Sequence, residues 1–149
     1  MPKIKIKANI RKDQPLNFEP THPAGYYYMF TGGYGFRNGK ITPEPVGDDD
    51  GPAGEVALAQ ESGSWEIKVK DTTRENFKIV QWNLSSEGIP GVAFAPAPDV
   101  DLTPTDKLTI NASNVPTGHY GSYDGYTVTL ENKDGKRVKL DPRIYDIRE

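Results

Sequence analysis

Apolar and polar residues alternate near the end of the chain in a pattern typical of two β-strands joined by a tight turn. Residues 126–130 place Tyr, Val and Leu at every second position, with threonine between them. Residues 138–140 repeat the alternation after a turn that contains Asp134 and Gly135. Because successive side chains on a strand point to opposite faces, this pattern predicts a hairpin with one buried face.

Shorter segments upstream show the same period of two, and no longer window carries a helical stripe. We expect strands near residues 3–10, 26–30, 56–60, 65–70, 77–84, 92–95 and 108–112, with a further hairpin that ends near Ile41. Segment 77–84 has apolar residues on both faces, which is typical of a central strand. About eight to ten short strands predict an all-β fold, a single-domain antiparallel β-sandwich of immunoglobulin-like or cupredoxin-like type over residues 1–149.

Two longer segments between the strands lack this alternation. Residues 42–54 are rich in proline, glycine and acidic residues, and we expect a mobile loop or arm there. Residues 114–125 are polar and contain tyrosine, so we expect a long loop before the terminal hairpin. With 15 Gly and 13 Pro in 149 residues, the composition also favours many short elements between turns.

Charge and the chain start add further expectations. The net charge is −3 with mixed signs, which gives nucleic-acid binding no support. Lys3, Lys5 and Lys7 alternate with isoleucine, and we expect them on the solvent face of an edge strand, where lysine discourages edge-to-edge pairing.

The first residues enter a strand pattern without an apolar leader, and no stretch is long and apolar enough for a membrane span. We therefore expect a cytoplasmic protein, with non-classical export as the open alternative.

The segment from Phe77 to Ile144 combines a strand, the run 108–112, the terminal hairpin and a closing Asp141–Pro142 dipeptide. This arrangement resembles small bacterial β-sandwich proteins of the DP-EP family, which have a cupredoxin-like or immunoglobulin-like layout. The resemblance covers somewhat under half of the chain. It implies a fold and no particular activity, because the family has no settled biochemical function.

Residue types exclude several kinds of chemistry. A blue-copper site needs a cysteine thiolate and two histidines, but the chain has no cysteine and only His22 and His119. The sequence offers no nucleophile elbow for a Ser-His-Asp hydrolase and no phosphate loop followed by a helix. We expect a non-enzymatic protein without a cofactor. The two histidines remain a minor alternative as a metal centre.

The acidic run Asp48, Asp49 and Asp50 is the best candidate for a cation site, since calcium prefers carboxylate and carbonyl oxygens. The EF-hand register does not fit, because it places Val46 and Ala57 at ligand positions. A solvated charge run is the simpler interpretation, and a looser calcium loop is the alternative.

Tyrosines flank two glycine-containing turns, and exposed loop aromatics often bind sugars or protein partners. Packing in the core is the competing interpretation, above all for Tyr126, which is placed like a corner tyrosine of a sandwich. The candidate binding residues are Tyr26, Tyr28, Tyr34, Phe36, His119, Tyr120 and Tyr123.

Two functions follow from these observations. The first is a structural or protein-interaction β-sandwich that forms a homo-oligomer or docks onto a bacterial partner protein. The alternative is a carbohydrate-binding module or lectin that binds a glycan through the loop tyrosines, with calcium at Asp48–Asp50 as an added ligand.

Overall fold

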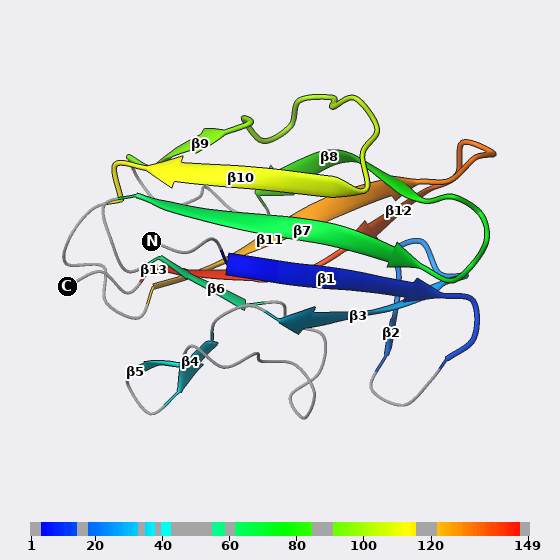
Figure 1. The fold of residues 1–149 in the computed structure, drawn as a ribbon, viewed down its shortest axis with the longest axis horizontal. Coiled ribbons are helices and arrows are strands. Elements are labelled where there is room, and N and C mark those ends of the chain that lie inside the picture. The colour runs from blue at the N-terminus through cyan, green and yellow to red at the C-terminus, as the bar shows by residue number, and fades with distance from the viewer. Residues whose placement is uncertain are drawn as a thin grey trace.

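A computed structural model describes residues 4–14, 18–32, 35–37, 40–42, 55–58, 62–84, 91–115 and 122–146. These residues form strands and connecting turns and contain no helix, and Figure 1 shows the strands in two layers. The predicted all-β, mostly antiparallel sandwich-like fold is therefore confirmed. In the same part of the chain there is no helix long and apolar enough to cross a membrane.

The first layer is a six-stranded sheet in the order β2-β3-β1-β7-β10-β9. Its strands are β1 (Ile4–Arg11), β2 (Glu19–Pro20), β3 (Tyr27–Gly32), β7 (Gly63–Asp71), β9 (Ala93–Ala95) and β10 (Lys107–Ser113). The pair β1–β7 is parallel, whereas the other neighbours are antiparallel. In Figure 1, β10, β7 and β1 lie in front of the second layer.

The second layer is arranged around one long strand, β11 (Ser122–Glu131). β8 (Lys78–Leu84) pairs with it on one side, and β12 (Arg137–Leu140) and β13 (Arg143–Asp146) pair with it on the other. β12 and β13 share one register with β11, interrupted only at Asp141–Pro142, so together they act as one broken strand. β6 (Glu55–Leu58) is added parallel to β13, and β4 (Gly35–Arg37) with β5 (Lys40–Thr42) forms a separate small hairpin.

The core lies between the two layers and is built from the inward residues of alternating strands. Trp65, Trp82 and Tyr126 are almost completely buried, and each tryptophan ring lies 6.1 Å from the tyrosine ring, centroid to centroid. The edge-to-face arrangement of these rings is the favourable one for aromatic pairs. Burial of Trp65, Ile67 and Val69 on one face of β7 follows the period of two from which a strand near residues 65–70 was expected.

Backbone bridges join the two layers at both open sides. Ile79 of β8 exchanges two hydrogen bonds with Thr105, just before β10, and Lys139 of β12 exchanges two with His22, between β2 and β3. These bridges occupy backbone groups that would otherwise be open at the sheet margins. The sandwich is thus partly sealed against strand-to-strand pairing with other chains.

Four expectations need correction. β1 is an interior strand between β3 and β7, so the lysines of its outer face do not protect an edge. Within the described residues β8 pairs with β11 alone, and its other edge is lined by the segment that includes Leu102, whose N–H bonds to the carbonyl of Val80. Residues 122–125 belong to β11 rather than to a loop. The described residues contain thirteen strands, more than the eight to ten expected, because several of these strands are only two to four residues long.

The terminal hairpin is as the alternation predicts. Val128 lies opposite Leu140 and Leu130 opposite Val138, with all four side chains fully buried. Gly135 has φ +84°, a left-handed conformation that suits glycine in this turn. Most of segment 42–54, namely residues 43–54, lies outside the described residues; Thr42 ends β5.

Candidate functional site

The tyrosines proposed from the sequence as binding residues are core residues where the structure describes them. Tyr26 is 6% exposed and Tyr28 is 2% exposed, and their rings pack edge-to-face on Phe77 and Phe30 respectively. Burial of both rings favours the packing interpretation for this pair.

The remaining candidates cannot be placed at side-chain level. Phe36 and Tyr123 belong to β4 and β11, but the description there extends only to the strand. Six further residues of the sequence prediction lie outside the described residues: Tyr34, His119, Tyr120 and the acidic residues Asp48, Asp49 and Asp50. Their roles stay predictions.

The outer face of the six-stranded sheet carries an unexpected concentration of lysine. Strand pairing puts Lys7 of β1 directly opposite Lys68 of β7, and Lys68 directly opposite Lys107 of β10. Neighbouring strands are about 4.8 Å apart, so three cationic side chains start within about 10 Å on adjacent strands. Like charges placed directly opposite in a sheet repel, so this row costs stability.

Two more lysines extend this row into a patch. Lys5 and Lys70 lie two residues from Lys7 and Lys68 on the same strands, and therefore on the same face. We call the set Lys5, Lys7, Lys68, Lys70 and Lys107 the lysine face; all five are exposed. Figure 1 views the sheet from this side.

Glu66 is the acidic residue at the centre of the lysine face. It lies opposite Lys5, and the Lys107 ammonium is 3.5 Å from its Oε1 atom. Although it points outward, Glu66 is only 7% exposed, as expected when long lysine stems cover a neighbouring carboxylate. Five lysines and one glutamate leave a net charge of +4 on this face of a chain whose total charge is −3.

A second polar cluster lies where four loops meet at one end of the sandwich. Glu75 accepts hydrogen bonds from the Tyr26 hydroxyl at 2.6 Å and the Asn132 amide at 2.9 Å, and pairs with the Lys12 ammonium at 2.8 Å. The contact with Lys12, followed by that with Tyr26, lowers the pKa of Glu75. The bond to Glu75 and, after it, burial raise the pKa of Tyr26 to about 12. All three partners are engaged in joining loops, which indicates a structural role.

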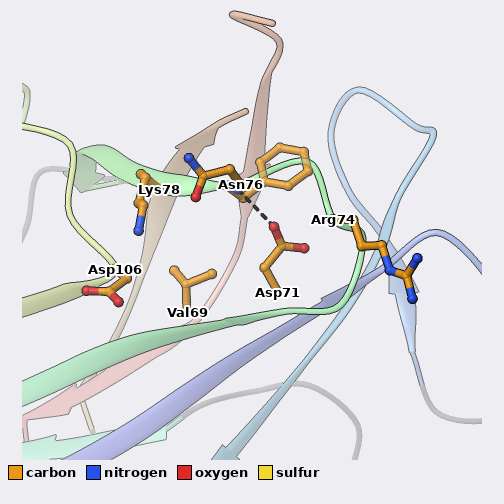
Figure 2. Close-up of a pocket in the computed structure, with 7 residues that line it drawn as sticks. Val69, Asp71, Arg74, Asn76, Lys78 and Asp106 are labelled. Carbon is orange, nitrogen blue, oxygen red and sulfur yellow. Dashed lines mark hydrogen bonds between the residues drawn. The ribbon is translucent and has the colours of Figure 1, made fainter. Parts of the chain in front are cut away.

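An open depression of about 340 Å³ lies beside this end of β7. Figure 2 shows Asp71 at its centre, Lys78 and Asp106 on one side and Arg74 pointing away from it. Both carboxylate oxygens of Asp71 are used by the turn that follows, because they accept bonds from the backbone and hydroxyl of Thr73 and from the Phe77 N–H. The depression is thus the surface of a capped turn rather than a site with converging ligands.

Within the described part of the chain, no group of three or more histidine or acidic side chains is close enough to hold a metal ion. Comparison of the sequence with protein-family models gave no match, and a search of curated proteins gave no significant one. The lysine face is consequently the strongest candidate site on physical grounds. The signal that could have found it is the repeated Lys-x-Lys pattern in segments 5–7 and 68–70.

Proposed function

We propose that this protein is a non-enzymatic β-sandwich that docks onto an acidic protein surface through its lysine face. The single observation that carries the proposal is the row of Lys7, Lys68 and Lys107 in direct register on three neighbouring strands. A fold gains nothing by placing three cations side by side, whereas an anionic partner turns their repulsion into attraction.

The shape and chemistry of this surface support binding rather than catalysis. The lysines stand on the exposed side of a sheet, and catalytic groups are usually found in concave sites that exclude water. Because backbone bridges occupy the sheet margins, binding through the face of the sheet is favoured over the addition of a strand at an open edge. Assignment to an immunoglobulin-like or cupredoxin-like sandwich of the DP-EP type is part of the proposal, and the two layers with their terminal hairpin support it.

Binding of a fluorescent poly-aspartate peptide at low salt tests the proposal. The test variant carries Lys7→Gln, Lys68→Gln and Lys107→Gln, and the control carries Lys133→Gln, Lys136→Gln and Lys139→Gln, three exposed lysines on or next to the terminal turn. Each exposed ion pair contributes about 0.2–1 kcal/mol, so we expect the test variant to bind roughly tenfold more weakly. The control variant has the same net charge as the test variant and should lose much less affinity for the peptide.

Equal losses in the two variants would show that bulk charge rather than the lysine face attracts the peptide. A labelled oligothymidine serves as the second probe. If it binds through the lysine face more tightly than poly-aspartate does at the same salt concentration, the partner class is nucleic acid and the proposal is wrong.

A further inference from the structure

The segment between β9 and β10 contains a short ridge that combines negative charge with an exposed apolar side chain. Asp99, Val100 and Asp101 are consecutive and all exposed, and Val100 is the large hydrophobic side chain that stands out on the described surface, at 50% exposure. An exposed valine between two carboxylates does not destabilise a monomer, but it does not contribute to the packing of the core either. We call residues 99–101 the acidic ridge.

Hydrogen bonds hold the acidic ridge in one conformation. The backbone N–H of Asp99 bonds to the Trp82 carbonyl at 2.8 Å, and the N–H of Leu102 bonds to the Val80 carbonyl at 2.9 Å. Asp99 also accepts a side-chain bond from Asn83, and Asp101 accepts one from Gln81 at 3.3 Å. These contacts anchor the ridge along β8, so little conformational entropy is lost when a partner binds it.

The ridge and the lysine face are complementary. Two carboxylates separated by one residue are about 5.5–7 Å apart at their Cα atoms, similar to the spacing of about 6.7 Å between Lys68 and Lys70 along β7. Both carboxylates keep oxygen atoms for further contacts, since a carboxylate has about four acceptor positions. The stems of the lysines and the half-buried Met29 on β3 offer apolar surface for Val100.

We infer that the partner of the lysine face is the acidic ridge of a second copy of this chain; this inference rests on the proposed function. The ridge belongs to the segment between β9 and β10, at the margin of the molecule, whereas the lysine face covers the broad side of the sheet (Figure 1). A contact between two different patches is heterologous. It leaves one face and one ridge unused at the ends, so copies add head to tail into a ring or a filament.

Charge reversal tests the contact in the full chain. Light scattering at increasing micromolar concentration and low salt should show the wild type associating, and association should disappear at about 1 M salt, where screening extends over only about 3 Å. Lys68→Glu and Asp101→Lys should each remain monomeric, because each places like charges in the contact. Lys139→Glu and Asp134→Lys, at exposed positions of the terminal hairpin, should associate as the wild type does.

Mixing the two charge-reversal variants provides the decisive test. In an equimolar mixture, the Asp101→Lys ridge meets the Lys68→Glu face with opposite charges, and the unchanged ridge of the Lys68→Glu variant meets the unchanged face of the Asp101→Lys variant. The two variants should therefore co-assemble in alternation, although neither associates alone. Near-ultraviolet circular dichroism confirms that each variant is folded. Failure of the mixture to associate would overturn the inference.

The outcomes separate the two proposals. A wild type that stays monomeric while its lysine face still binds poly-aspartate refutes the self-contact but leaves the acidic partner intact. Poly-aspartate binding that is insensitive to the lysine face refutes both.

Discussion

Replacement of Lys68 by glutamine should stabilise the protein while weakening the proposed binding of acidic partners. Lys68 has Lys7 directly opposite on one side and Lys107 on the other. Each such like-charge pair costs about 0.2–1 kcal/mol, and the nearby Glu66 offsets part of this cost. We therefore expect Lys68→Gln to raise the free energy of unfolding by about 0.5–1 kcal/mol at low salt, equivalent to roughly 1–4 °C in Tm for a chain of this size.

Urea unfolding at about 0.01 M and about 1 M salt measures this effect. The gain should shrink strongly at the higher salt concentration, because screening removes the repulsion that the substitution relieves. Lys139→Gln is the matched control, since Lys139 lies opposite Thr129 rather than another lysine. A variant that is less stable than wild type, or a gain that does not depend on salt, would refute the reasoning about the row.

Three further predictions concern the core and the loop cluster. The pKa of Glu75 is lowered, so its contacts stabilise the fold at pH values above the ordinary pKa of 4.5, and this stabilisation is lost as the pH falls below that value. The difference in stability between wild type and Glu75→Gln, measured by thermal unfolding from neutral to acid pH, should therefore narrow below pH 4.5. A difference that stays constant with pH would contradict this prediction. Burial raises the pKa of Tyr126, and the Trp65 indole opposes that rise. Among the described residues, neither the Tyr126 hydroxyl nor the Trp65 indole N–H makes a hydrogen bond of normal geometry. Tyr126→Phe should therefore stabilise the protein by about 1 kcal/mol in urea unfolding, whereas a loss of that size would indicate a bonded hydroxyl. Gly32 has φ +87° and a Cβ there would lie 2.5 Å from the Lys5 carbonyl oxygen, so Gly32→Ala should cost about 2 kcal/mol or more, and calorimetry showing an unchanged Tm would disprove the clash.

The sequence was sufficient where structure depends on neighbours along the chain. The alternation of apolar and polar residues predicted the terminal hairpin and the strand that became β7, because burial on one face of a strand repeats every second residue. It could not show that β1 pairs with β7, since that choice depends on tertiary contacts between segments about 60 residues apart. The edge-strand explanation of Lys5 and Lys7 failed for this reason.

The candidate site was hidden for the same reason. Lys7, Lys68 and Lys107 come from three distant segments and become neighbours only through pairing. The tyrosines near glycine turns drew attention instead, but Tyr26 and Tyr28 are core residues, because the chain enters β3 directly after the turn. Residue type near a loop is thus a weaker guide to exposure than position within the strand period.

The parallel pairing of β1 with β7 also determines when the lysine face, the proposed binding surface, is formed. β1 precedes β7 in the chain by about 50 intervening residues, and such non-local pairing is characteristic of slow folding. Until β7 and β10 are in place, Lys5 and Lys7 stand on a strand that can pair only with β3, and the row of three lysines does not exist. The lysine face is therefore a product of the finished topology, and a nascent or truncated chain that ends before β7 carries the early lysines without the row on which the proposed binding depends.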